Sequence, residues 1–187
     1  SLDYEHAYEL LFSARLAAQC TDARVNLVTP ALFARYPDAK AFADADIHEL
    51  EELIKSTGFY HNKAKNIIAC CQRLCEVYGG QVPDTMEDLL SLAGVGRKTA
   101  NLVLGDAFGQ PAVVVDTHCI RLSGRLGLTV HKEQEKIEKD LRRILPPDKS
   151  NDFCHRLVLH GRAVCNARKP KCDICTLSDL CPSKGKA

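Results

Sequence analysis

Four cysteines near the end of the chain have the spacing of a metal site. They are Cys165, Cys172, Cys175 and Cys181, separated by six, two and five residues. One short loop therefore supplies four thiolate ligands, which suits either tetrahedral zinc or an iron–sulfur cluster. Structural zinc normally uses two close pairs of ligands, and only Cys172 and Cys175 have that spacing. The wider arms of the pattern favour an iron–sulfur cubane over a single zinc ion.

Three cations, Arg168, Lys169 and Lys171, lie between the first two cysteines of this set. Cations at such a position suit a phosphate backbone, although a lysine-rich loop is also commonly a solvated surface run. A bound cluster would fix the shape of the loop, and preorganised cations bind better than mobile ones. We therefore interpret the cluster as a structural element that presents these cations to nucleic acid.

A second candidate site is the segment 92–100, which reads Leu-Ala-Gly-Val-Gly-Arg-Lys-Thr-Ala. Its two glycines allow a tight turn between a helix over 85–92 and another over 97–108, and they leave backbone N–H groups uncovered. Those groups lie at the start of the second helix, where the helix dipole favours an anion and Arg97 and Lys98 add positive charge. The segment predicts a helical hairpin that binds a phosphate.

The hairpin segment has two other possible interpretations. Its glycines would serve equally as caps in an ordinary helix–turn–helix connection. A nucleotide P-loop is excluded, because Ser91 stands where its first glycine is needed and Arg97 separates Gly96 from Lys98.

Composition limits the class of protein further. The chain has 187 residues, 45% of them hydrophobic, which is enough to bury one sizeable core or two small ones. Because 25 Lys and Arg balance 24 Asp and Glu, any nucleic-acid-binding face must be local. No membrane-spanning run or signal peptide is apparent. The six cysteines outside the cluster occupy apolar helical positions, so we expect an intracellular protein, cytoplasmic and nucleoid-associated in a bacterium.

Helical periodicity dominates the chain, which predicts an all-α protein. Helices are expected over 8–18, 22–32, 62–78, 85–92, 97–108, 117–126, 133–145 and 151–161, with shorter ones capped by Asp38 and Asp46. Asp22 is expected to cap the second of these helices and Pro30 to kink it. The strand-like run 111–115 is predicted to be an extended lead-in to the next helix. We predict two domains, a six-helix domain with the hairpin over 1–110 and a helical domain with the cluster over 111–187.

Taken together, these motifs resemble the endonuclease III family, the iron–sulfur DNA glycosylases of the helix-hairpin-helix (HhH-GPD) superfamily. The matching stretches are Ala18–Asp22, Gly58–Ala64, Leu92–Asn101, Val115–His118 and Leu159–Arg162, followed by the four cysteines. They occur in the family's order and span nearly the whole chain. The hairpin alone occurs in many DNA-binding proteins, whereas its combination with Lys98, Asp116 and the cysteines is specific.

The resemblance implies a two-domain helical fold with a helical barrel domain, a 4Fe–4S cluster and an active site in the cleft between domains. It implies a base-excision-repair enzyme that acts on duplex DNA containing damaged pyrimidines or abasic sites. No pattern in the sequence indicates an oligomer, so we expect a monomer. Such an enzyme flips the damaged nucleotide out of the stack and removes the oxidised base. Lys98 would attack the anomeric carbon of the sugar and form a Schiff base, and β-elimination would then cut the strand.

The resemblance also assigns roles to individual residues. Asp116 would assist Lys98, Gln19 would enter the space left by the flipped nucleotide, and Phe59 would wedge into the duplex, where the family usually has leucine. The hairpin residues Gly94, Val95, Gly96 and Arg97 would bind DNA. Each of four residues also has a simpler interpretation. Lys98 would contact a phosphate, Asp116 would be a helix N-cap, Gln19 would cap a turn and Phe59 would belong to the core.

Two alternative functions stay open on the sequence alone. One is a monofunctional adenine glycosylase-like enzyme, although such enzymes generally lack the lysine at position 98 and carry a C-terminal extension that we do not expect here. The other is a non-catalytic DNA-binding hairpin module. We also expect the N-terminal helix that usually packs beside the cluster domain to be missing.

Overall fold

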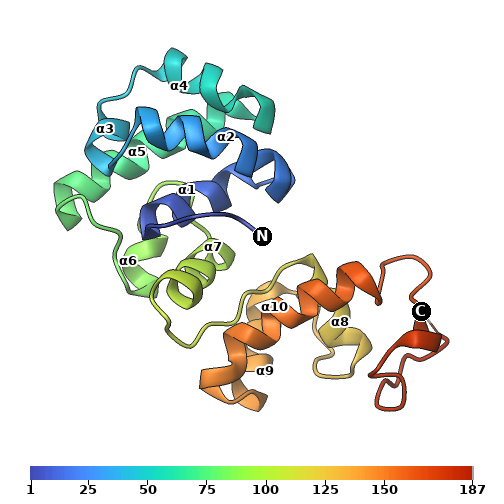
Figure 1. Cartoon of the computed structure of the whole chain (residues 1–187). Helices are drawn as coiled ribbons and strands as arrows, with labels where there is room; N and C mark the ends of the chain where they lie inside the picture. Colours follow the sequence, from blue (N-terminus) through green and yellow to red (C-terminus); the bar gives the residue numbers. More distant parts are fainter. Residues whose placement is uncertain (187) are drawn as a thin grey trace. The chain divides into compact units, whose positions relative to one another are not determined.

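A computed structural model describes residues 1–186 of the chain (Figure 1). Within these residues the secondary structure is helical and contains no strand, which confirms the all-α prediction. The run 111–115 is extended and leads into a helix, as expected. The chain divides into two compact units, unit 1 over Ser1–Phe108 and unit 2 from Gly109 onward.

Unit 1 contains seven α-helices, as many as the periodicity indicated for this part of the chain. They are α1 (Ala7–Leu16), α2 (Asp22–Arg35), α3 (Ala39–Ala43), α4 (Ile47–Ile54), α5 (Tyr60–Tyr78), α6 (Met86–Leu90) and α7 (Arg97–Leu102). A 3₁₀ turn, η1 (Lys55–Thr57), follows α4, and a π-helix, η2 (Val103–Ala107), follows α7.

The core of unit 1 is built around α1, which packs against α2, α5, α7 and η2 (Figure 1). Leu11, Phe12 and Leu16 recur at helical spacing on its buried face and are fully inaccessible to solvent. The Phe12 ring lies 5.1 Å from that of Phe42, centroid to centroid, in a tilted arrangement typical of aromatic pairs. This helix therefore anchors the loops that leave its two ends.

Unit 2 contains α8 (Thr117–Arg125), α9 (Gln134–Ile144) and α10 (Pro147–Ala163), followed by a 3₁₀ turn, η3 (Cys172–Ile174). Its core joins the extended lead-in to the helices through Val113, Cys119 and Ile137, all fully buried. After α10 the chain continues as an irregular loop that carries the four cysteines.

Several predicted helix boundaries were wrong. The helix expected over 97–108 ends at Leu102 and continues as η2, whose wider turn keeps Val103 and Leu104 buried. The helix expected over 151–161 begins at Pro147, because the first turn of a helix needs no N–H from its proline.

The second helix also starts differently from the prediction. The cap of α2 is Thr21, whose hydroxyl accepts the Arg24 N–H at 3.2 Å, rather than Asp22. The helix then runs past Pro30 to Arg35.

Within the described residues, every helix is too short or too polar to span a bilayer.

The central position of α1 yields a prediction about stability. Replacing the fully buried Phe12 by alanine should lower the free energy of unfolding by roughly 3–5 kcal/mol, because the ring leaves a cavity in the core. Replacing Leu27, which is 72% exposed on α2, should change it by no more than about 0.5 kcal/mol. Urea unfolding followed by circular dichroism measures both, and equal losses would contradict the assignment of the core.

Candidate active site and metal centre

The predicted hairpin is present between α6 and α7. Leu92 and Val95 point into the core of unit 1, with 2% and 7% of their surface exposed. Gly94 and Gly96 are exposed, and Gly94 adopts a left-handed conformation with φ +69°. Gly96 is the N-cap of α7, so the first N–H groups of this helix lack intrahelical partners. The turn is thus fixed from inside while its backbone stays open to an anion.

A buried arginine lies directly behind this turn. Arg15, on α1, is only 7% exposed, and its Nη1 donates a hydrogen bond of 2.7 Å to the carbonyl oxygen of Ala93. A Cβ atom at Gly94 would approach this guanidinium to 2.5 Å at Nη1 and 2.7 Å at Cζ. Burial lowers the pKa of Arg15. Sequence reasoning missed Arg15. Its position four residues after Leu11, on the apolar face of the helix, could have indicated that this charge is buried.

Lys98 is the second residue of α7 and is exposed. Its ammonium makes no hydrogen bond or ion pair with any part of the chain that the structure describes. Arg97, one residue before it, is half-buried. An exposed, unengaged amine at the start of a helix is available either to a phosphate or to a reacting sugar.

Asp116 is the N-cap of α8, as the simpler interpretation held. One of its carboxylate oxygens, Oδ1, accepts the N–H of Cys119 at 2.7 Å, and the residue is half-buried. A backbone donor of this kind orients the carboxylate. The cap and a role in catalysis are compatible, because the bond occupies only one oxygen.

Gln19 and Phe59 lie in two separate loops of unit 1 and are both exposed. Phe59 has 66% of its surface exposed, so the interpretation of this residue as part of the core was wrong. Both residues have left-handed backbone conformations, with φ +54° for Gln19 and +50° for Phe59. Such a conformation costs about 1–2 kcal/mol for a residue other than glycine. Strain of this kind is commonly stored at functional sites.

The cations of the cysteine loop differ in their surroundings. Arg168 and Lys169 are exposed and make no hydrogen bond or ion pair within residues 1–186. Lys171 instead donates from Nζ to the carbonyl oxygen of Ala163 at 3.1 Å, which ties it to the last residue of α10. Lys169 has φ +56°, and the described chain has only two other non-glycine residues with positive φ, Gln19 and Phe59.

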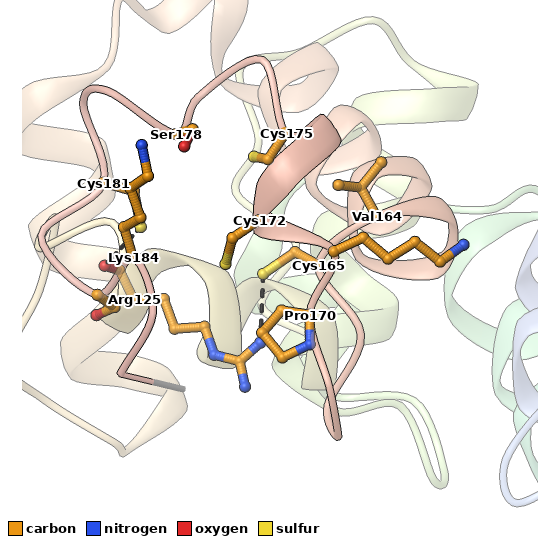
Figure 2. Close-up of a pocket in the computed structure, with 11 residues that line it drawn as sticks. Arg125, Val164, Cys165, Pro170, Cys172, Cys175, Ser178, Cys181 and Lys184 are labelled. Carbon is orange, nitrogen blue, oxygen red and sulfur yellow. Dashed lines mark hydrogen bonds between the residues drawn. The ribbon is translucent and has the colours of Figure 1, made fainter.

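The four cysteines line one hollow in unit 2, shown in Figure 2. It measures about 350 Å³, part of it open to solvent. Arg125 of α8 reaches across it and donates from Nη1 to Cys165 Sγ at 3.3 Å and to the carbonyl oxygen of Asn166 at 2.7 Å. His160 Nε2 lies 3.4 Å from Cys175 Sγ. Sequence reasoning missed both Arg125 and His160 as neighbours of the site.

This arrangement suits an iron–sulfur cluster. The four cysteines belong to one loop and line a single hollow, so their sulfurs can serve together as the ligands of a cubane. The hydrogen bond from Arg125 also helps to orient the side chain of Cys165.

The other six cysteines are free thiols. Cys70, Cys71, Cys119 and Cys154 are buried, which agrees with their predicted behaviour as small hydrophobic residues. Burial raises the pKa of Cys70 to about 11, so this thiol stays protonated near neutral pH.

Comparison with known proteins places these features in a family. The model of the HhH-GPD superfamily base excision DNA repair proteins matches residues 12–147. The model of the iron–sulfur binding domain of endonuclease III matches residues 165–181, the segment with the four cysteines.

Individual relatives match along nearly the whole chain. The endonuclease III of Synechocystis is 56% identical over 184 residues, which cover 98% of this chain and 84% of the relative. Two solved structures each have a TM-score of 0.92 and 42% identity, and the match covers 98% of this chain and 86% of theirs. One is a non-covalent endonuclease III–DNA complex, and the other is a trapped endonuclease III–DNA covalent intermediate.

The hairpin fold and the cysteine centre thus define a base excision DNA repair protein, and the chain belongs to the HhH-GPD superfamily. Within that superfamily its family is that of endonuclease III. Its function is that of a bifunctional DNA glycosylase and abasic-site lyase, and its cofactor is a 4Fe–4S cluster.

The contact between Gly94 and Arg15 yields a second prediction. Replacing Gly94 by alanine should destabilise the protein by about 2 kcal/mol or more, because the left-handed backbone is strained and the guanidinium is displaced. Replacing Gly96, where an added Cβ meets nothing within 4 Å, should cost only about 0.5–1 kcal/mol as a poorer helix cap. Chemical denaturation compares them, and an equal or reversed order would show that Arg15 does not constrain the turn.

The cysteine centre yields a third prediction. Replacing Cys172 by serine should sharply lower the iron and acid-labile sulfide content of the purified protein, since one ligand of the cluster is lost. Replacing the half-buried Cys20, which lies in unit 1, should leave both contents unchanged. Retention of full iron and sulfide by the Cys172 variant would contradict its assignment as a ligand.

Proposed function

We propose that Lys98 is the nucleophile of this glycosylase and lyase, and that its substrates are oxidised pyrimidines and abasic sites in duplex DNA. The observation that carries the proposal is the position of Lys98. Its exposed and unengaged amine follows directly after the turn that the hairpin offers to a DNA phosphate. The start of α7 would therefore both bind the DNA strand and place the Lys98 amine next to it.

The reaction needs the damaged nucleotide to leave the duplex stack. The neutral amine of Lys98 then attacks the anomeric carbon C1′ of the sugar, and the bond to the base breaks with a proton delivered to the departing base. The attached nitrogen then loses a proton, and its lone pair breaks the bond between C1′ and O4′ while O4′ takes up a proton. The sugar ring opens and leaves a Schiff base between Lys98 and C1′. Removal of a proton from C2′ expels the 3′ phosphate and cuts the strand. Water then hydrolyses the Schiff base and returns the free lysine.

Asp116 is proposed to support this sequence from the start of α8. A carboxylate there stabilises positive charge that develops on the sugar as the base leaves. It also accepts and returns protons during ring opening and elimination. The hydrogen bond from Cys119 N–H keeps the group oriented for both tasks.

The remaining predicted residues would hold the DNA. Gln19 would fill the space left by the flipped nucleotide and Phe59 would stack into the duplex, which agrees with their exposure. Gly94, Val95, Gly96 and Arg97 would bind one phosphate through the hairpin. Arg168, Lys169 and Lys171 would contact the DNA backbone elsewhere, with Lys171 acting in part through the loop that it ties to α10.

Cys165, Cys172, Cys175 and Cys181 would be the ligands of the 4Fe–4S cluster. When bound, the cluster cross-links the loop, and no bond of the substrate is made or broken through it. We propose that units 1 and 2 are the two domains of a monomer. Lysine nucleophiles distinguish glycosylases with lyase activity from the adenine branch, which supports pyrimidine lesions as the substrates.

The nucleophile is tested by borohydride reduction, which converts a Schiff base into a stable adduct. On duplex DNA with one thymine glycol, the protein should form a DNA adduct visible on a denaturing gel, and the variant Lys98→Gln should form none. The matched control is Lys65→Gln, an exposed lysine on α5. It should trap DNA like the unaltered protein.

Two outcomes would contradict the proposal. Undiminished trapping by Lys98→Gln would place the nucleophile on another amine. Release of adenine opposite 8-oxoguanine, in preference to thymine glycol and without an adduct, would support the monofunctional adenine branch instead.

A further inference from the structure

The two proposed wedge residues lie in different loops. Gln19 lies between α1 and α2, and Phe59 lies between η1 and α5. Both are held in left-handed conformations that residues other than glycine rarely adopt. A strained conformation persists only where the surrounding structure fixes it. Some other contact must therefore hold each loop in place.

A single buried lysine contacts both loops. Lys63, in the first turn of α5, is only 6% exposed. Its Nζ donates one hydrogen bond of 2.8 Å to the carbonyl oxygen of Leu16 and another of 2.9 Å to that of Thr57. Gln19 follows three residues after Leu16, and Phe59 follows two residues after Thr57. The ammonium of Lys63 thus links the two segments of chain that precede Gln19 and Phe59.

The two carbonyl groups are those of the last residues of helical segments. Leu16 ends α1 and Thr57 ends η1, where carbonyl oxygens lack a partner within their own helix. Their partial negative charge suits an ammonium. A buried carbonyl left without a donor is costly, so removal of Lys63 would release both loop starts at once.

The burial of Lys63 is itself unfavourable. It makes no ion pair with a carboxylate among residues 1–186. Burial lowers its pKa, as expected for a cation withdrawn from water. An apolar side chain would fill the same space without this cost but would supply no donors. What the lysine provides is therefore the pair of directed hydrogen bonds.

We propose that Lys63 is a positioning residue, which couples the loops of Gln19 and Phe59 so that both side chains enter the duplex together when a nucleotide is flipped. This inference rests on the proposed DNA contacts of those two residues. Fixing both loops before binding removes the entropic cost of ordering them on the DNA. The effect should appear in steps that need a paired nucleotide to open and be small in chemistry at an abasic site.

The test compares Lys63→Met with Lys63→Arg and with the exposed neighbour Lys65→Met as the matched control. Single-turnover rates are measured with cluster-loaded protein on two duplexes, one with a paired thymine glycol and one with an abasic site. For Lys63→Met we expect base release from the paired lesion to slow by about tenfold or more and strand cleavage at the abasic site by less than about threefold. Lys63→Arg keeps the positive charge and several hydrogen-bond donors. Its rate of base release should therefore lie between those of Lys63→Met and the unaltered protein.

A second readout follows opening of the duplex without chemistry. In a Lys98→Gln background, 2-aminopurine beside the lesion should become fluorescent on binding. Adding Lys63→Met should reduce that rise, and adding Lys65→Met should not. If Lys63→Met does not fold, Lys63→Gln, which keeps one donor group, takes its place in both experiments.

The outcomes separate the two proposals. If Gln19→Ala and Phe59→Ala slow base release but Lys63→Met does not, only the role of Lys63 is wrong. If Lys63→Met slows the reaction equally on both duplexes and also lowers thermal stability, Lys63 has a purely structural role and the proposed positioning role is wrong. If Gln19→Ala and Phe59→Ala are themselves without effect, the proposed wedge contacts fail and the inference about Lys63 fails with them. The trapping result with Lys98→Gln is independent of all these outcomes.

Discussion

Helix ends carry backbone carbonyl groups that have no partner in their own helix, and loops leave further carbonyl groups unpaired. In this protein, cationic side chains satisfy several such groups at the loops that we propose contact DNA and at the cysteine loop. Arg15 bonds to Ala93 beneath the hairpin turn, Lys63 bonds to the ends of α1 and η1, and Arg125 bonds to Asn166 in the cysteine loop. In each case the cationic side chain donates to a backbone carbonyl oxygen. This bond fixes the shape of the loop.

This way of holding loops leaves their outer surfaces open. The hairpin exposes Gly94 and Gly96, and the loops after α1 and η1 expose Gln19 and Phe59. None of these positions needs its own side chain to fix the turn from outside. This arrangement lowers the stability of the fold in two ways. The cations of Arg15 and Lys63 are withdrawn from water, and the left-handed backbone at Gln19 and Phe59 is strained. Sites that must fit DNA closely are commonly built at such a cost in stability.

The sequence predicted features that depend on residues close together in the chain. The spacing of the four cysteines indicated the metal centre, the two glycines located the hairpin, and Asp116 before Thr117 indicated a helix cap. Each of these patterns expresses a local rule of ligand spacing, backbone freedom or capping. The same rules gave an all-α chain with most helices near their observed positions.

The supporting contacts were not predictable in this way, because their partners are distant in sequence. Arg15 and Ala93 are 78 residues apart, Lys63 and Leu16 are 47 apart, and Arg125 and Asn166 are 41 apart. Only the fold brings these groups together. On the sequence alone, a core position after Gly58 remained an alternative for Phe59, because a left-handed backbone has no reliable signal in a residue other than glycine. The switch to a π-helix after Leu102 follows from tertiary packing of Val103 and Leu104.

Whether the hairpin presents Lys98 as the nucleophile is tested most closely by mapping the covalent bond between protein and DNA. The adduct formed with thymine glycol DNA is reduced with borohydride, digested with a protease and a nuclease, and sequenced by mass spectrometry. We predict that the residual sugar is attached to the side chain of Lys98. Attachment to any other lysine, or to the amino terminus, would contradict the account.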